Sequence, residues 1–172
     1  PRFVPAWGRV MAIEDFLSVL APQTTGSTLA VESADNVSLT MFVKMASNGL
    51  PVAVDTSSPE ARAALARGRV SFVRRVGERN HACADCHASD QGANKFLGGR
   101  FLADATRGLT RHFPTWRTSA NDAWDLRRRF QWCMTPLGTN MLAADAVEYA
   151  ELELYLTQFD NGKPMSVPGI RH

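Results

Sequence analysis

Residues 81–87 read His81-Ala82-Cys83-Ala84-Asp85-Cys86-His87 and contain the C-x-x-C-H pattern that is typical of covalent haem attachment. Two thiols three residues apart on one helical turn reach both vinyl groups of a porphyrin, so Cys83 and Cys86 are expected to form thioethers. The adjacent imidazole of His87 is then directed at the iron as the proximal ligand. This stretch predicts a cytochrome with one covalently bound haem c.

Two other kinds of site can use a C-x-x-C pair. A zinc knuckle would have to take its ligands from this stretch: His81, Cys83, Cys86 and His87. Tetrahedral zinc sites usually draw a second pair of ligands from further along the chain, and no second C-x-x-C exists here. A thioredoxin-like dithiol follows a buried strand, whereas a helical, arginine-rich segment precedes this pair. Haem is therefore favoured over both.

Length and composition are those of an ordinary globular protein. The 172 residues suffice for one domain or for two small cytochrome-sized units, and the net charge of +2 is too small to indicate nucleic-acid binding. No apolar run approaches the roughly 20 residues of a membrane span. The chain opens at Pro1 without a leader, and haem is attached to C-x-x-C-H outside the cytoplasm, so we expect a periplasmic protein whose export signal has been removed.

An internal repeat divides the chain. The segment from Leu39 to Val54 resembles the segment from Leu152 to Val167, including an Asn-Gly-x-Pro exit, and the offset of 113 residues persists backwards to Pro1 and Pro114. Residues 1–54 and 114–167 are therefore interpreted as copies of one unit. The predicted domains are 1–56, a haem-less partial copy of a cytochrome c-like unit in which Phe16 and Leu20 serve as core, and 57–172, a class I cytochrome c-like domain.

The predicted fold is all-α. Ser58, Pro59 and Glu60 form a helix start, and that helix should run to about Val76 with Leu65, Phe72, Val73 and Val76 inward. Gly68 permits close approach of a closing helix, which opens with Asp145-x-x-Glu148 and offers Leu152 and Tyr155 as partners. Residues 88–118 have no clear period and are expected to wrap the haem edge as loop.

A third helix is expected from about Asp122 through Cys133, with Leu126, Phe130 and Cys133 on one apolar face. Arg129 lies one turn before Cys133, where its charge would favour the thiolate. Arg127 and Arg128 are expected on a solvated face. The candidates for the distal iron ligand are Cys133, Met134, Met141, His112 and His81. Spacing alone does not choose among them, although Cys133 is the one thiol not committed to haem attachment.

Five segments together resemble the SoxA family, the catalytic haem subunits of the SoxAX complex of bacterial thiosulfate oxidation: Gly68-Arg69-Val70-x-Phe72, Ala82-Cys83-Ala84-Asp85-Cys86-His87, Phe113-Pro114-x-Trp116-Arg117, Leu126-Arg127-Arg128-Arg129-Phe130-x-x-Cys133, and Leu152-Glu153-Leu154-Tyr155-Leu156 with Asn161-Gly162-x-Pro164. The resemblance covers the chain from about Thr40 to its end. The placement of R-x-x-x-C between the haem motif and the closing helix is its specific part.

The resemblance implies an L-cysteine S-thiosulfotransferase. His87 would be the proximal ligand and Cys133 the distal ligand, carried as a persulfide, with Arg129 beside it to steady the sulfur anion and thiosulfate. Thiosulfate would be conjugated oxidatively to a cysteine of the carrier SoxYZ. Two electrons would leave through haem to the SoxX cytochrome, with which the chain would form a heterodimer.

Two departures from the family pattern leave alternatives open. One C-x-x-C-H implies a mono-haem form, and a second active-site arginine expected near the end of the closing helix is replaced by Gln158-Phe159-Asp160-Asn161. Arg117 or Arg171 is a candidate to take its place. The alternatives are a periplasmic electron-transfer cytochrome c with Met134 or Met141 on the iron, and a non-catalytic haem subunit of a larger complex.

Overall fold

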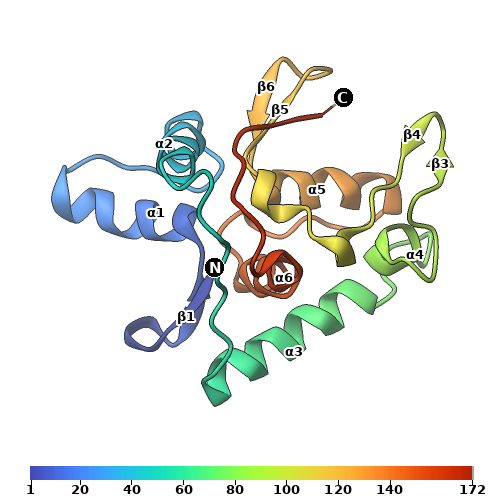
Figure 1. Ribbon diagram of the computed structural model, residues 1–172, viewed down its shortest axis with the longest axis horizontal. Coiled ribbons are helices and arrows are strands. Elements are labelled where there is room, and N and C mark those ends of the chain that lie inside the picture. The colour runs from blue at the N-terminus through green and yellow to red at the C-terminus, as the bar shows by residue number, and fades with distance from the viewer. Residues whose placement is uncertain (172) are drawn as a thin grey trace.

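The computed structural model describes residues 1–171, and helices carry most of its regular structure (Figure 1). The α-helices are α1 (Ile13–Thr24), α2 (Ala34–Met45), α3 (Pro59–Val73), α4 (Cys83–His87), α5 (Leu126–Leu137) and α6 (Val147–Thr157). The short strands are β1 (Arg2–Val4), β2 (Arg9–Met11), β3 (Phe96–Leu97), β4 (Arg100–Phe101), β5 (Thr115–Arg117), β6 (Asp122–Trp124) and β7 (Gly169–Arg171).

The strands are a departure from the all-α prediction. β1 pairs with β2 and β3 with β4 as antiparallel hairpins, while β5 lies between antiparallel β6 and parallel β7. Each strand is two or three residues long, too short for alternation of apolar and polar residues to signal it in the sequence. The segment expected to be loop, 88–118, contains β3, β4 and β5.

The predicted crossing of two helices is the centre of the cytochrome c domain. A Cβ at Gly68 of α3 would overlap the backbone carbonyl of Glu151 and lie 2.9 Å from the Cβ of Tyr155, so these helices meet at backbone distance. Phe72 and Tyr155 lie beside this contact with ring centroids 5.5 Å apart. The buried side chains around the crossing are Phe72, Ala88, Ala105, Leu152 and Leu156.

One predicted helix end and two predicted helix starts differ in the structure. Ser58 caps α3 by accepting a hydrogen bond from the Ala61 amide at 3.0 Å, as expected, but the helix ends at Val73, which is 48% exposed. The chain must turn there, because Val76 pairs with His81 in a bridge just before α4. α5 begins at Leu126 after the Asp125 cap, and no side chain caps α6, so the predicted starts at Asp122 and Asp145 were wrong.

Elements of the two halves recur at the offset seen in the sequence. β1, β2 and α1 start at Arg2, Arg9 and Ile13, and β5, β6 and α5 start 113 residues later at Thr115, Asp122 and Leu126. Each of these three pairs has the same length. Leu20, at the position that corresponds to Cys133, is 40% exposed, so its prediction as core was wrong. The inward face of α1 carries Glu14, Asp15 and Ala21 instead.

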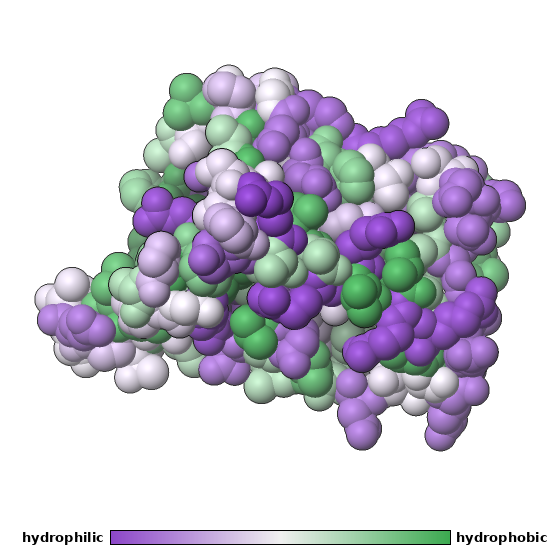
Figure 2. Space-filling model, turned by 90° about the horizontal axis from the view of Figure 1, so that it is seen from below, coloured by the Kyte–Doolittle hydropathy of each residue, from purple (hydrophilic) through white to green (hydrophobic). Residues whose placement is uncertain are grey.

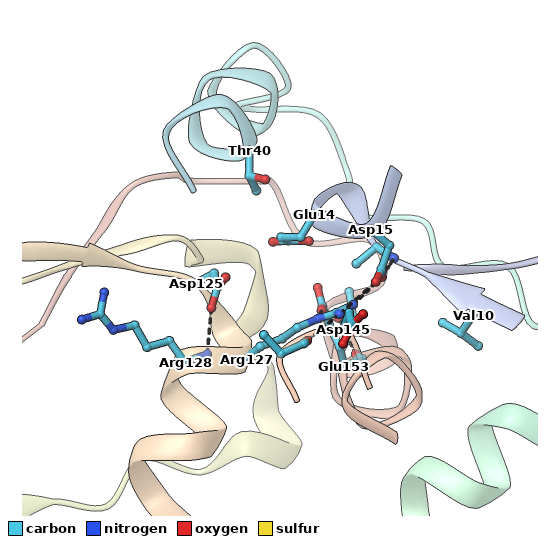
Figure 3. A network of polar contacts seen from close by, with 12 residues as sticks. Val10, Glu14, Asp15, Thr40, Asp125, Arg127, Arg128, Asp145 and Glu153 are labelled. Carbon is cyan, nitrogen blue, oxygen red and sulfur yellow. Dashed lines mark hydrogen bonds and ion pairs between the residues drawn. The ribbon is translucent and has the colours of Figure 1, made fainter. Parts of the chain in front are cut away.

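A buried ionic network joins α1 to α5 and α6 (Figure 3). The guanidinium of Arg127 is fully buried and pairs with Asp15, with Nη1 donating to Oδ1 at 2.9 Å, and its Nε lies 3.8 Å from Glu153. Glu14 pairs with Lys44 of α2 at 3.2 Å. The prediction that Arg127 lies on a solvated face was therefore wrong, because acidic side chains of α1 and α6 surround it.

The outer surface mixes polar and apolar residues. Figure 2 views the molecule from below Figure 1, where green hydrophobic groups form separate patches among purple hydrophilic ones. In the described chain, no helix has the length and apolar character needed to cross a bilayer.

Candidate functional site

The C-x-x-C-H sequence forms the short helix α4, which sits at the end of α3 (Figure 1). The Asp85 carboxylate closes this turn by accepting a hydrogen bond from the Ala82 amide at 3.0 Å, and its other oxygen pairs with Arg75 at 3.1 Å. Cys83 and Cys86 are free, partly buried thiols. They therefore lie on one fixed helical turn, as the sequence predicts.

The imidazole of His87 is held by a backbone carbonyl. Its Nδ1 lies 2.8 Å from the Ala103 oxygen, and because a carbonyl can only accept, Nδ1 carries the proton. Nε2 is then the unprotonated nitrogen, which is the form that ligates iron. Burial lowers the pKa of His87, the bond to Ala103 opposes this, and the charge of Arg129 lowers it further, so the ring is neutral at pH 7.

These donors fit a haem c: two free thiols on one turn and an imidazole whose second nitrogen is oriented by a backbone hydrogen bond. A zinc knuckle fits less well. Within residues 1–171, no three side chains of His, Cys, Asp or Glu come together in a way that could hold a metal ion.

Cys133 lies on α5 among charged groups and the two motif cysteines. Burial raises the pKa of its thiol, the Arg129 guanidinium opposes that rise, Cys86 adds to it, and Arg117 opposes it. The pKa of Cys83 is raised to about 11 by burial first and then by Cys133. Arg129 acts in the expected direction, but burial outweighs it. A thiolate at Cys133 therefore needs a further positive charge, of the kind that a coordinated metal ion supplies.

The other candidates for the distal ligand have different surroundings. The sulfur of Met134 accepts a hydrogen bond from the Tyr149 hydroxyl at 3.2 Å, and Met141 is 55% exposed. His112 Nδ1 bonds to the Ser166 carbonyl at 3.0 Å, and His81 lies in the backbone bridge to Val76. Cys133 interacts electrostatically with both Cys83 and Cys86 of α4.

The sequence offers Arg117 only as a candidate to replace the expected second arginine, and in the structure Arg117 interacts electrostatically with Cys133. It projects from β5, the middle strand of the three-stranded sheet, and its electrostatic interactions include Arg129 and Cys133. Gln158, in the position where a second arginine was expected, donates instead to the Tyr155 carbonyl at 2.8 Å. The Ala103 carbonyl could not be found from sequence, because a backbone acceptor leaves no residue-type signal.

A helical domain with this crossing and this motif is a c-type cytochrome domain. The SoxA/TsdA cytochrome c domain family matches residues 67–165, which is more than half of the chain, and the chain belongs to that family. The cofactor of such a domain is haem c.

Individual relatives agree with this assignment. The chain is 30% identical over 140 residues to the L-cysteine S-thiosulfotransferase subunit SoxA of Pseudaminobacter salicylatoxidans, covering 81% of this chain and 47% of that protein. It is 28% identical over 173 residues to the subunit of the same name from Allochromatium vinosum, covering 99% and 60%. The chain thus spans about half the length of the curated relatives it matches.

The fold has a solved counterpart. The crystal structure of SoxXA from P. pantotrophus superposes with a TM-score of 0.86, covering 100% of this chain and 63% of that one, at 23% identity. At that identity the likeness concerns the fold.

Proposed function

We propose that this chain is the mono-haem catalytic domain of a SoxA-type L-cysteine S-thiosulfotransferase, which conjugates thiosulfate to a carrier cysteine. The observation that carries the proposal is the placement of the Cys133 thiol with Arg129 and Arg117 beside the α4 cysteines. The names of its relatives and its family membership support the same reaction.

In this proposal, Cys83 and Cys86 would hold the haem covalently, and His87 and Cys133 would be the two protein ligands of its iron. Burial raises the pKa of Cys133, so its thiolate would require a strong positive charge nearby, which a coordinated iron would supply. Haem c, when bound, supplies the one-electron redox centre of the site. Arg129 neutralises the negative charge of the Cys133 sulfur and of the incoming thiosulfate.

The reaction joins the terminal sulfur of thiosulfate to the sulfur of the carrier cysteine. One S–S bond forms, the carrier S–H bond breaks, and one proton and two electrons are released. The electrons must leave singly, which requires a second redox protein, and we propose a SoxX-like cytochrome in this role and a SoxYZ-like protein as carrier. Since haem is attached to C-x-x-C-H outside the cytoplasm, we place the protein in the periplasm.

The test is turnover with a matched pair of variants. The holoprotein is incubated with thiosulfate, a thiol-bearing carrier and an oxidised cytochrome c acceptor, while acceptor reduction is followed by absorbance and the carrier adduct by mass spectrometry. Cys133→Ala should abolish adduct formation, and Met141→Leu should leave it unchanged. An adduct formed equally by wild type and Cys133→Ala would refute the proposal.

The alternatives make different predictions in the same assay. An electron-transfer cytochrome with Met ligation would be reduced and reoxidised without forming a carrier adduct. Its electron transfer would change on substitution of Met134 or Met141 rather than of Cys133. A non-catalytic haem subunit would keep Cys133 ligation but yield no adduct. The replacement of the expected second arginine by Gln158 is the observation that favours this last alternative.

A further inference from the structure

The turn between α3 and α4, residues 76–81, packs its backbone against the end of α5. The amides of Glu78 and Arg79 donate to the carbonyls of Gly138 and Leu137 at 3.2 and 3.3 Å. Leu137 is the last residue of α5 and Gly138 is its C-cap, so neither carbonyl has an amide of its own helix to accept from. The 76–81 turn is therefore joined to α5 through the backbone.

The last turn of α5 depends on such support. Pro136 lies inside it and has no N–H, so the helical hydrogen bond to the carbonyl of Trp132 cannot form. Cys133 begins this part of the helix, and Leu137 follows it by four residues, on the same face. Any movement of the last turn of α5 against the 76–81 turn would therefore carry Cys133 with it.

The same turn is fixed to the haem-attachment motif. Val76 and His81 exchange backbone hydrogen bonds of 3.0 and 3.2 Å, which close the turn just before α4 begins. Arg75 bridges the turn to α4, because it donates to the Asn80 carbonyl at 3.0 Å and to the Asp85 carboxylate at 3.1 Å. The turn thus connects α4 directly to the end of α5.

Gly77 makes the contact between the turn and α5 possible. Its φ of +71° is in the left-handed region, and a Cβ built on it would overlap the carbonyl oxygen of Leu137. On the other side of the contact, Gly138 has a φ of +66°, and a Cβ on it would lie 3.2 Å from the Cβ of Glu78. A glycine on each side therefore allows the two backbones to approach.

We propose that Gly77 is a positioning residue, which through the 76–81 turn sets the separation of α4 from α5 and with it the position of Cys133 relative to a haem attached to α4. That Cys133 is the iron ligand rests on the proposed function, whereas the hold of the turn on α5 does not, because Met134 lies on the same helix. The electrostatic interactions of Cys133 with both α4 cysteines support a short separation. Alanine at position 77 would displace α5, because the nearest atoms it meets belong to the backbone and cannot turn aside.

Displacement of the distal ligand by imidazole tests the proposal without turnover. The oxidised holoprotein is titrated with imidazole, and binding to the iron is followed in the Soret band. Gly77→Ala should bind imidazole roughly tenfold or more tighter than wild type, because a displaced α5 keeps its ligand on the iron for a smaller fraction of the time. Gly26→Ala is the matched control and should bind imidazole within about twofold of wild type. Gly26 has the same φ of +71°, but a Cβ there would meet no described atom within 4 Å.

A milder pair of variants decides the question if Gly77→Ala loses its haem or its fold. Asn80, in the same turn, has a φ of +50°. Asn80→Gly keeps this conformation accessible and should bind imidazole as wild type does. Asn80→Val places a β-branched side chain where φ is positive, which disfavours the turn, and it should bind imidazole more tightly. Low-temperature EPR of the same samples shows whether a thiolate remains on the iron.

Imidazole affinities of Gly77→Ala and Asn80→Val equal to that of wild type would overturn the proposal. Equal increases in Gly77→Ala and Gly26→Ala would also overturn it, because backbone strain alone would then explain the effect. A wild type with a methionine-type EPR signal whose imidazole affinity depends on Gly77 would uphold the positioning role and refute ligation by Cys133.

Discussion

The Nδ1 of His87 and the carbonyl oxygen of Ala103 lie 2.8 Å apart across 16 residues of chain. This bond fixes both the tautomer and the orientation of the imidazole, and it ties α4 to the segment that follows the β3–β4 hairpin. With Nδ1 hydrogen-bonded to a backbone carbonyl, a histidine presents its unprotonated Nε2 in a fixed direction. The bond therefore supports His87 as the proximal ligand independently of the C-x-x-C-H pattern.

Covalent attachment should depend on the two motif cysteines and not on the third. Replacement of both Cys83 and Cys86 by serine should leave no haem on the chain after denaturing electrophoresis with peroxidase staining, because no thioether can form. Cys133→Ser should retain the stain. Loss of stain in Cys133→Ser with retention in the double variant would show that the attachment sites are misassigned.

Gly68→Ala should destabilise the protein. On an exposed helical position this change stabilises by up to about 1 kcal/mol, through helix propensity. Here the added methyl meets the Glu151 carbonyl and Tyr155, so we expect a loss of about 1–3 kcal/mol in the free energy of unfolding, measured with urea. Ala66→Ser, on an exposed position of the same helix, serves as control and should change stability by less than about 0.7 kcal/mol. A stabilised Gly68→Ala variant would contradict the close helix crossing.

Arg127 and Arg128, which are adjacent on α5, should differ in their contributions to the free energy of unfolding. Arg127→Met leaves Glu153 buried without its ion-pair partner and leaves Asp15 with only Arg9, at 3.2 Å, which is expected to cost about 3–5 kcal/mol of the free energy of unfolding. Arg128→Met breaks a half-exposed pair with Asp122 and should cost about 0–1 kcal/mol. Equal effects in urea unfolding would mean that the network in Figure 3 does not hold the two halves together.

Asp125 should make stability depend on pH. Burial raises its pKa to about 7, with Glu14 and Glu32 adding to the rise and the Arg128 amide opposing it. A carboxyl whose pKa is higher in the folded state than in the unfolded state holds its proton in the folded state between pH about 4 and 7. Its contribution to stability is present below about pH 4 and is lost as pH rises to about 7.

Asp125→Asn keeps the helix cap and removes this titration. Relative to wild type, the variant should gain roughly 2.5 kcal/mol in the free energy of unfolding between pH 5 and pH 8. Urea unfolding at the two values measures the difference. The same difference between wild type and variant at both pH values would show that Asp125 is ionised throughout.

Spacing and residue type were enough to predict the short helical turn that carries Cys83, Cys86 and His87 and the helix that carries Cys133, because both depend on local sequence. The crossing at Gly68 is a long-range contact, but a small residue at helical spacing was enough to indicate it. The burial of Arg127 could not be predicted, since its partners come from Asp15, 112 residues away, and from Glu153. The place of Arg117 on the middle strand of a sheet could not be predicted either, because it depends on the pairing of β5 with β6 and β7.

Low-temperature EPR of the oxidised protein, with Cys133→Met beside wild type, tests the central claim most directly. Ligation by His87 and Cys133 predicts a low-spin, thiolate-type signal in wild type that is absent from the variant. A methionine-type signal unchanged by the substitution would contradict the account, and the protein would then be a carrier of single electrons.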